Sequence, residues 1–289
     1  CIGFTHQLSM QISNVENTKN RSDYSLRIGD KLIDLSTPIV MGIVNTTPDS
    51  FYDKSRSKSI LNSLKIVEGM ISEGTTIVDI GGYSSRPGAD NVSIPEEIER
   101  TSQLITEIRK TFPEVIVSLD TFRGEVAKEG IESGAQIIND ISGFELDGTM
   151  LSTITHYKVP YVLMHMRGTP KTMKNLTDYK NIFSELISYF SEKIKILQDG
   201  GLKDIIIDPG FGFSKTIEQN YFLLDHLDHF QILNKPVLAG LSRKSMIYTK
   251  LGITPEESLP ETIRLNKIAL EKGASILRVH DVKEAVEMI

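Results

Sequence analysis

The sequence has little that would suit a secreted, disulfide-bonded or membrane protein. It holds 1 cysteine in 289 residues, which excludes an internal disulfide and a metal site built from several cysteines, and which fits the reducing cytoplasm. No apolar run approaches the roughly 20 residues that a membrane-spanning helix needs. The N-terminal segment has no basic stretch followed by a long apolar one, so it does not resemble a signal peptide. We therefore expect a cytoplasmic protein that does not bind membranes.

Basic residues are also few. The chain has 32 lysines and arginines against 38 acidic residues, a net charge of -6, and its basic residues form no blocks. Nucleic-acid binding depends on neutralising phosphates with clustered cations. The charge pattern therefore argues against a nucleic acid as partner and leaves small molecules as the expected ligands.

Short apolar runs alternate with longer amphipathic ones from Pro38 onward. Apolar residues in the longer runs recur at spacings of three and four, which is typical of helices. Helix ends are marked by glycines such as Gly74, Gly134 and Gly273. The predicted strands are 38–44, 75–80, 115–120, 135–140, 160–166, 204–209, 236–242 and 275–280. This alternation predicts parallel βαβ units with helices on the faces of the sheet.

Eight strands, each followed by a helix, predict an α/β fold of the (β/α)8 TIM-barrel type. An open doubly wound sheet is the alternative, but no glycine-rich dinucleotide fingerprint is present. Alternating residues around Gly29-Asp30 predict an N-terminal β-hairpin over residues 24–35 that caps the bottom of the barrel. No linker divides the chain, so we expect residues 21–289 to be a single domain and residues 1–20 a leader or a disordered N-terminus.

Polar residues stand at the end of every predicted strand. One such aspartate would more often be a helix cap, but eight ends of this kind would converge on one mouth of a barrel. A buried polar cluster needs a ligand or mutual partners. The residues at the ends are Asn45, Asp79, Asp120, Asn139, Asp140, His165, Asp208, Ser242, Arg243, Lys244, Arg278 and His280.

The residue types indicate the ligand. Asp120, Asn139 and Asp208 offer acceptors and a donor to a flat heterocycle that bears N–H groups. A second set can bind an anion, and its arginines match phosphate geometry; its members are Arg86, Lys244, Arg278 and His280. These types indicate a polar heterocycle that carries a phosphate or diphosphate, without identifying the heterocycle.

Seven motifs occur in order, each at a strand end. They are GIVNTTPDSF (42–51), GGYSSRPGA (81–89), SLDT (118–121), INDISG (138–143), DPGFGF (208–213), GLSRKSM (240–246) and RVHDV (278–282). One of them alone would be weak evidence. Together they closely resemble the dihydropteroate synthase family, over a stretch from about Pro38 to the C-terminus.

The resemblance implies a reaction that joins 6-hydroxymethyl-7,8-dihydropterin diphosphate to 4-aminobenzoate, with Mg²⁺, releasing diphosphate. It implies Asn45 as the Mg²⁺ contact. It also implies catalytic roles for Asp120, Asp208, Lys244 and Arg86. The implied substrate-binding residues are Ser85, Arg86, Pro87, Asp120, Asn139, Asp208, Lys244, Ser245, Arg278 and His280. We expect a dissociative route, in which diphosphate leaves before the amine attacks.

The resemblance further implies a homodimer and a sulfonamide target. The chain departs from the family's usual Glu-Ser-Thr-Arg-Pro, because it has Tyr83 in place of the acid and Ser85 in place of threonine. Ser214 stands where a glycine is common, and we expect that change to be neutral.

Several readings stay open on the sequence alone. The rival functions are a corrinoid-linked, pterin-dependent methyltransferase and a non-catalytic barrel subunit. His165 is either a core histidine or a lining of the pocket, and Asp79 bonds either the second loop or the substrate. We expect residues 96–100 (EEIER) to be a solvated helix face, and His156, His226 and His229 to be surface or packing residues.

Overall fold

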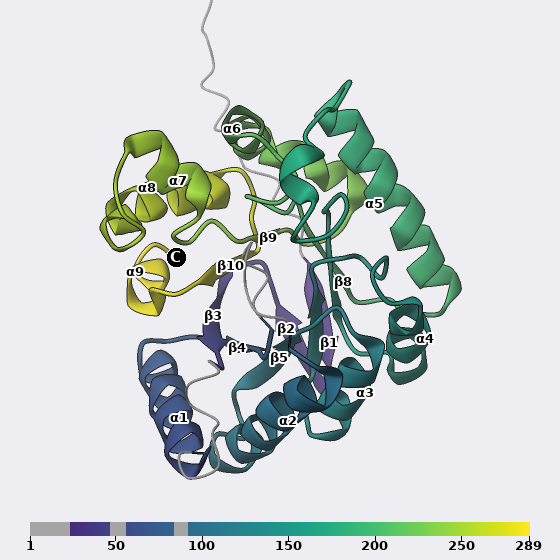
Figure 1. The fold of residues 1–289 in the computed structure, drawn as a ribbon, viewed down its shortest axis with the longest axis vertical. Coiled ribbons are helices and arrows are strands. Elements are labelled where there is room, and N and C mark those ends of the chain that lie inside the picture. Colours follow the sequence, from purple (N-terminus) through teal and green to yellow (C-terminus); the bar gives the residue numbers. More distant parts are fainter. Residues whose placement is uncertain (1–23, 47–55, 84–91) are drawn as a thin grey trace, which may run out of the picture.

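The computed structural model describes residues 24–46, 56–83 and 92–289. Two short strands, β1 (Ser25–Ile28) and β2 (Lys31–Asp34), come first in the chain. Eight parallel strands and the helices around them follow (Figure 1). The barrel strands are β3 (Ile39–Asn45), β4 (Ile77–Gly81), β5 (Ile116–Asp120), β6 (Ile137–Asp140), β7 (Tyr161–Met164), β8 (Ile205–Asp208), β9 (Leu238–Ala239) and β10 (Ile276–Val279). The helices are α1 (Arg56–Ser72), α2 (Ile94–Thr111), α3 (Gly124–Glu132), α4 (Gly148–Tyr157), α5 (Ile182–Asp199), α6 (Ile217–Asp225), α7 (Ser245–Leu251), α8 (Leu259–Glu271) and α9 (Val282–Val286).

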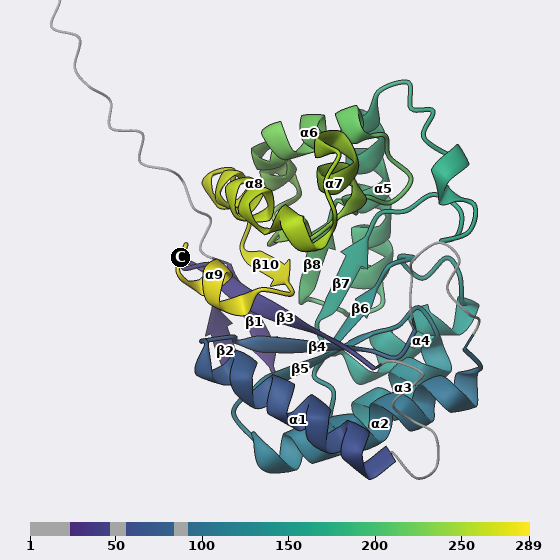
Figure 2. The same cartoon turned by 60° about the vertical axis from the view of Figure 1, so that its left-hand side comes forward.

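The eight strands form one parallel sheet in the order β8-β7-β6-β5-β4-β3-β10-β9. A single bridge between Ile207 and Val237 joins the two edge strands and closes the barrel. Helices surround the strands in both views (Figures 1 and 2). The predicted (β/α)8 barrel is confirmed, and the open doubly wound sheet is wrong.

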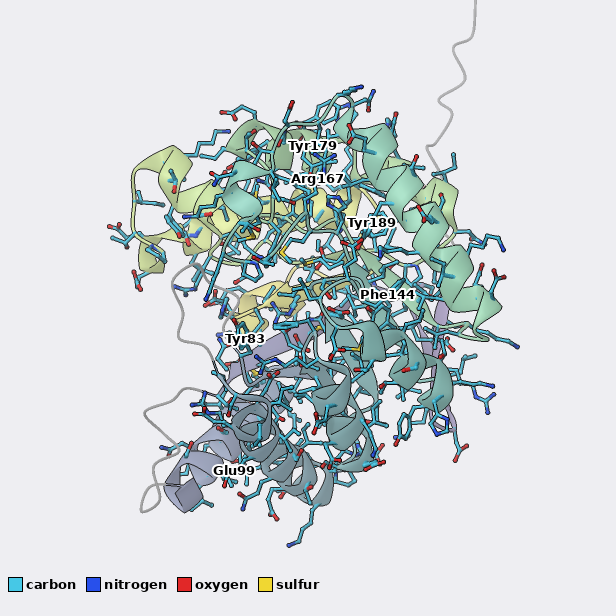
Figure 3. All side chains as sticks on the ribbon, turned by 45° about the vertical axis from the view of Figure 1, so that its right-hand side comes forward. Tyr83, Glu99, Phe144, Arg167, Tyr179 and Tyr189 are labelled. Carbon is cyan, nitrogen blue, oxygen red and sulfur yellow. The ribbon has the colours of Figure 1, made fainter. Side chains whose placement is uncertain are left out.

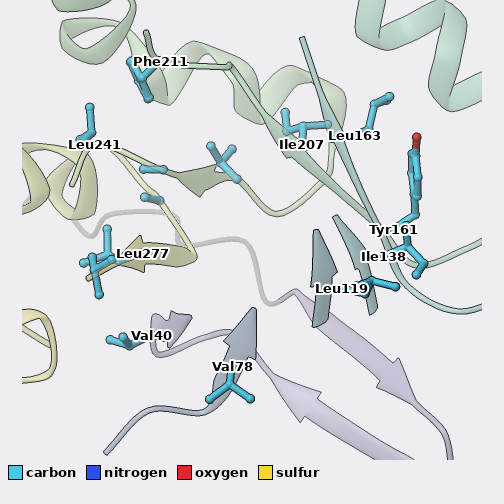
Figure 4. Close-up of a cluster of buried hydrophobic side chains, with 14 of the residues drawn as sticks. Val40, Val78, Leu119, Ile138, Tyr161, Leu163, Ile207, Phe211, Leu241 and Leu277 are labelled. Carbon is cyan, nitrogen blue, oxygen red and sulfur yellow. The ribbon is translucent and has the colours of Figure 1, made fainter. Parts of the chain in front are cut away.

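The outward side chains of the strands pack against the helices. Figure 4 shows this layer, in which Val78, Leu119 and Ile138 belong to the neighbouring strands β4, β5 and β6. Successive side chains of a strand point to opposite faces, so the residues between these point into the barrel. Both faces are therefore buried, which explains why the strands read as unbroken apolar runs.

The inward side chains at the start of the strands form an apolar layer at the bottom of the barrel. Met41 pairs with Ile77 and Ile77 pairs with Ile116, so the layer lies in register across neighbouring strands. Every barrel strand contributes one residue: Met41, Ile77, Ile116, Ile137, Val162, Ile206, Leu238 and Ile276. This layer separates the bottom of the barrel from the polar residues above it.

The hairpin of β1 and β2 covers this bottom layer. The strands are antiparallel, and Gly29 forms their turn with a φ of 59°, a conformation that favours glycine. Leu26, Ile28 and Leu35 join the bottom apolar cluster. The backbone N–H of Arg27 donates to Asp204 Oδ1 at 3.0 Å and ties the hairpin to the segment before β8. The predicted hairpin cap is confirmed.

Two details differ from the sequence prediction. The seventh barrel strand is short, because the chain turns after Gly240 and Lys244 N donates to Leu241 O at 3.3 Å. Two helices, α7 and α8, follow this strand where one was expected. The glycine signals held, since Gly74, Gly134 and Gly273 all have positive φ. None of the helices in the described part of the chain is long and apolar enough to cross a membrane.

The hairpin offers a matched test of its sealing role. Leu26 is 1% exposed and Leu32 is 70% exposed on the same hairpin. We expect Leu26→Ala to lower the free energy of unfolding by about 2–4 kcal/mol, as a cavity in a packed core does. Leu32→Ala should change it by less than about 0.5 kcal/mol. Urea denaturation measures both, and equal losses in the two variants would contradict the sealing role.

Candidate active site

A polar layer lies directly above the apolar one inside the barrel. The next inward position of a strand is two residues along, and in five strands that position is polar. Ile77 is followed in this way by Asp79, Ile116 by Ser118, Ile137 by Asn139, Ile206 by Asp208 and Ile276 by Arg278. Asp79, Asn139 and Asp208 are buried at 0%, 4% and 7% exposure. The alternation of side chains along the strands thus brings together, inside the barrel, polar residues that the sequence places at the strand ends.

Arg278 bridges two carboxylates in this layer. Its Nε donates to Asp79 Oδ2 and its Nη2 to Asp120 Oδ2, both at 2.7 Å. Asn139 Nδ2 also donates to Asp79 Oδ2, at 2.9 Å. Asp79 therefore contacts Arg278 and Asn139. Its expected contact with the second loop or the substrate stays a prediction, because residues 84–91 of that loop lie outside the described residues. The buried Oδ1 of Asp79 has no partner among the described residues.

Burial perturbs the carboxyl groups of the layer. Desolvation raises the pKa of Asp120, and the guanidinium of Arg278 opposes that shift. Desolvation also raises the pKa of Asp208, opposed by the N–H of Gly210 and by the Lys244 ammonium. Carboxylates whose charge is held in place by a few cations are typical of functional sites. Both groups can accept hydrogen bonds from the N–H edge of a heterocycle.

Lys244 faces the same space from the segment after β9. Its Nζ lies 4.3 Å from the centre of the Phe213 ring, a cation–π contact. Desolvation lowers the pKa of Lys244 to about 8, and the Asp208 carboxylate opposes that shift. Phe213 belongs to a small apolar cluster at the mouth with Ile141, Met164 and Met166. The mouth therefore combines an apolar wall with a cation that titrates close to neutral pH.

The turn after β8 is held by Lys215, a buried lysine. Lys215 Nζ donates to Phe213 O at 2.9 Å and to Gly210 O at 3.1 Å, and it lies 3.1 Å from His165 Nδ1. A side chain on Gly210 would come within 2.2 Å of His165 O, so only glycine fits there. Gly210 N in turn donates to Asp208 Oδ1 at 2.7 Å. Lys215 thus fixes the turn that orients Asp208.

His165 lies in the core beside this turn. It is 4% exposed, and its ring packs edge-on against Tyr189 with centroids 4.8 Å apart. Desolvation lowers the pKa of His165 to about 2, with the Lys215 cation adding to the shift. Figure 3 shows Tyr189, a residue of α5, and Tyr179 near Arg167. The guanidinium carbon of Arg167 lies 3.7 Å from the centre of the Tyr179 ring. The structure favours the core role for His165.

Ser214 adopts a left-handed conformation, with a φ of 46°. Such a conformation costs a non-glycine residue about 1–2 kcal/mol. In return, its Oγ accepts a hydrogen bond from Arg167 N at 3.0 Å, and a bond of this kind contributes about 1 kcal/mol. The two terms nearly cancel, which is a physical reason for the expected neutrality of serine at this position.

The ends of β9 and β10 are joined by two side-chain contacts. Ser242 Oγ lies 3.0 Å from His280 Nδ1 and accepts from His280 N at 3.2 Å. Arg243 binds both carboxylate oxygens of Asp281, at 2.7 and 3.0 Å. Ser245 is exposed and begins α7. His280 and Ser245 therefore lie on neighbouring segments at the mouth, as the barrel predicts.

Asn45 ends β3 on the same side. It is exposed, and its side chain makes no hydrogen bond to a described residue; its Oδ1 lies 3.7 Å from the point where a Cβ on Gly81 would stand, close to Asp120. Mg²⁺ keeps several waters and is commonly held by one or two protein oxygens together with substrate phosphates. An exposed amide oxygen near the polar layer fits that requirement. The described residues contain no group of three His, Cys, Asp or Glu side chains that could hold a metal alone.

Three expected site residues lie outside the described residues: Ser85, Arg86 and Pro87. The segments on either side of them are described, and Tyr83 is placed at the end of β4.

The sequence prediction for residues 96–100 was wrong in part. Glu97 is 0% exposed and Arg100 is 6% exposed, so this face of α2 is not fully solvated. The signal was present, because Glu97 and Thr101 continue the three- and four-residue spacing of Leu104, Ile105 and Ile108. His156, in contrast, is exposed, as expected.

The Lys244 ammonium sets a pH test. The group is charged below about pH 8 and neutral above it, and kcat/KM reports the pKa values of the free enzyme. We expect kcat/KM for the pterin diphosphate, the substrate that the family resemblance implies, to fall as the pH rises above about 8. Lys244→Arg should remove that decline, because arginine stays charged. Lys250→Arg, at an exposed lysine of α7, is the control and should keep the decline. An unchanged decline of kcat/KM in Lys244→Arg would show that the Lys244 ammonium is not the group that titrates.

Comparisons with known proteins agree with this geometry. The family model described as "Pterin binding enzyme" matches residues 41–280. The chain is 44% identical over 257 residues to the dihydropteroate synthase of Escherichia coli (strain K12), covering 88% of this chain and 90% of that one. It superposes on the Yersinia pestis dihydropteroate synthase in a sulfonamide drug complex with a TM-score of 0.85 and 37% identity, covering 92% and 96% of the two chains. It superposes on the Xanthomonas albilineans dihydropteroate synthase with 4-aminobenzoic acid with a TM-score of 0.83 and 35% identity, over the same shares.

Proposed function

We infer that this chain, which belongs to the pterin-binding enzyme family, is a dihydropteroate synthase. It joins 6-hydroxymethyl-7,8-dihydropterin diphosphate to 4-aminobenzoate and releases diphosphate. The observation that carries this inference is the polar layer at the mouth, in a chain similar to such enzymes over most of its length. The members of that layer and its rim are Asp79, Asp120, Asn139, Asp208, Lys244 and Arg278.

The pterin edge would bind to Asp120, Asn139, Asp208 and Lys244. Carboxylate oxygens accept from the N–H groups of the ring, while the amide and the ammonium donate to its acceptors. Arg278 would leave part of its contact with Asp120, cover a ring face and bind the diphosphate together with Arg86 and His280. Arginine suits this exchange because its planar fork fits carboxylate and phosphate equally.

The diphosphate becomes a good leaving group when its charge is neutralised. With Mg²⁺ held by the Asn45 amide oxygen and the substrate phosphates, part of that charge would be offset. Lys244, Arg278 and His280 would supply the rest. No protein nucleophile is required, so Cys1 has no catalytic part.

We propose that the reaction is dissociative. The C–O bond to the diphosphate breaks first, and the electron pair leaves with the diphosphate. The Asp120 and Asp208 carboxylates, held in a desolvated layer, then stabilise the positive charge that spreads into the ring. The amine of 4-aminobenzoate forms the new C–N bond and loses a proton.

The second substrate would bind at Ser85, Arg86, Pro87 and Ser245. A cation there would pair with its carboxylate, and the apolar wall around Phe213 would contact its ring. Because sulfonamides resemble 4-aminobenzoate in shape, we propose that they compete at this site. The retained Asp208, Lys244 and Arg278 argue against a non-catalytic barrel, and a corrinoid-linked methyltransferase has no use for a 4-aminobenzoate site.

The reaction has a direct test. With both substrates and Mg²⁺, we expect the purified chain to produce diphosphate and labelled dihydropteroate in equal amounts. Omitting either substrate, or adding a chelator of Mg²⁺, should abolish both products. Diphosphate without dihydropteroate, or methyl transfer in place of condensation, would overturn the assignment.

We also propose that the chain acts in the cytoplasm as a homodimer that pairs through its last helices. In support, Phe222 on α6 and Leu251 on α7 are 44% and 49% exposed, and α6 contacts both α7 and α8. Figures 1 and 2 place these three helices together on one side of the barrel.

The dimer predicts a solution mass twice the 32.3 kDa of the chain by sedimentation equilibrium. The double variant Phe222→Asp, Leu251→Asp should have the mass of a monomer, because buried charges oppose association. Leu61→Asp, at a leucine on α1 that is 58% exposed, is the control. A monomeric wild-type chain would refute the proposal.

A further inference from the structure

Asp79 and Asp120 contact the same guanidinium but differ in their access to water. In the register of β4 and β5, Asp79 pairs with Ser118, whereas Asp120 pairs with Gly81, two residues nearer the mouth. Asp79 therefore lies one inward position deeper in the barrel than Asp120. The side chain of Asp79 is 0% exposed and that of Asp120 is 20% exposed.

Arg278 meets the two carboxylates with different ends of its guanidinium. The Nε, next to the aliphatic stem, donates to Asp79, and the terminal Nη2 donates to Asp120, each at 2.7 Å. Because β3 lies between β10 and β4 in the sheet, the Arg278 side chain crosses the inside of the barrel to reach them. A turn of the side chain about the Nε contact would move its Nη end away from Asp120 and leave Asp79 in place.

Burial decides which of the two contacts can be given up. Within the described residues, Arg278 is the one cation in contact with Asp79, and Asp79 Oδ1 has no partner at all. Without Arg278, Asp79 would be an uncompensated buried charge, which is strongly destabilising. Asp120 is partly exposed, so water can solvate its carboxylate when Arg278 leaves it. The guanidinium can therefore exchange Asp120 for another anion, but it cannot exchange Asp79.

The contacts of Asp79 also show how its charge can be tested without changing its shape. Its Oδ2 accepts from Arg278 Nε and from Asn139 Nδ2, the latter at 2.9 Å. The amide oxygen of an asparagine can accept the same two hydrogen bonds but carries no charge. Asp79→Asn therefore removes the charge that holds Arg278 and leaves an acceptor for Asn139.

We propose that Asp79 is a positioning residue that anchors Arg278 by its Nε, so that the Nη end turns from Asp120 to the diphosphate of the substrate. Arg278 then stays at the mouth in both arrangements, and Asp120 loses its cation when the diphosphate gains it. The Asp120 carboxylate is left available for the positive charge that develops in the ring. This inference rests on the proposed dihydropteroate synthase activity, to which it adds the residue that holds Arg278 during the exchange.

Calorimetric titration of inorganic diphosphate into the full chain, without pterin or Mg²⁺, tests the exchange. Diphosphate has no ring edge, so it has no use for Asn139. Asp79→Asn and Asp120→Asn each remove one negative charge from the same layer, and Coulomb attraction alone would tighten anion binding in both.

The anchoring role predicts opposite changes in the two variants. In Asp79→Asn, Arg278 must give up its one remaining carboxylate partner, and we expect the Kd for diphosphate to rise at least about tenfold. In Asp120→Asn, the Nη end has no carboxylate to leave, so the Kd should fall. The double variant Asp79→Asn, Asp120→Asn should regain a Kd within about threefold of the wild type, because the contact that opposes the exchange is gone.

Ser118→Ala is the matched control. Ser118 is 0% exposed and pairs with Asp79 in register, and its Oγ has no partner among the described residues. The variant should leave the Kd for diphosphate within about twofold, since it changes the layer without changing its charge. Urea denaturation of every variant shows that it is folded.

Three results would overturn the anchoring role. They are tighter diphosphate binding in Asp79→Asn, a loss in that variant that Asp120→Asn does not restore, and a wild-type chain that does not bind diphosphate. Failure of the proposed function would appear separately, as a wild-type chain that forms no dihydropteroate from its two substrates.

Discussion

The site depends on one geometric constraint, the two-residue alternation of a β-strand inside a closed barrel. One inward layer is apolar and is sealed from below by Leu26, Ile28 and Leu35. The next inward layer, two residues along, carries Asp79 and Arg278 among its polar groups. A shift of one residue in register would turn the polar set toward the helices. The apolar seal at the bottom of the barrel and the polar site at its mouth therefore both follow from the two-residue alternation of the strands.

Burying charges in that layer costs free energy unless they are paired. Arg278 meets this need by bridging Asp79 and Asp120, and Lys215 does so by taking backbone carbonyls as partners. The pairing is incomplete, because one oxygen of Asp79 has no partner among the described residues. When a substrate binds at this mouth, it can replace some of the ion pairs between these side chains. The charged groups are already in place, and preorganised groups of this kind stabilise charge that develops in a reaction.

The strand-end residues could be predicted from the sequence for two reasons. The eight predicted strands imply a barrel whose strand ends meet at one mouth, and the residues at those ends are polar. Asp120, Asn139, Asp208 and Arg278 lie together at the strand ends, as predicted for these reasons, and their roles in binding stay predictions. The burial of Glu97 was not predicted. A carboxylate in a charged helical segment is expected to be solvated unless the three- and four-residue spacing of the buried residues is extended by one more turn. The partner of Asp79 was missed as well, because a contact between residues 199 positions apart depends on barrel closure.

The central claim is that this polar layer is the pterin diphosphate site. Calorimetric titration of the substrate into the chain without 4-aminobenzoate tests it most directly. Asp208→Asn keeps the shape and the Gly210 contact but removes the charge, and relief of a buried charge should leave the chain as stable as before. We predict that the wild-type chain binds the pterin diphosphate alone, and that Asp208→Asn binds it at least about 100-fold more weakly, as expected for a lost charge-assisted contact. Equal affinity in the two folded proteins would contradict the account.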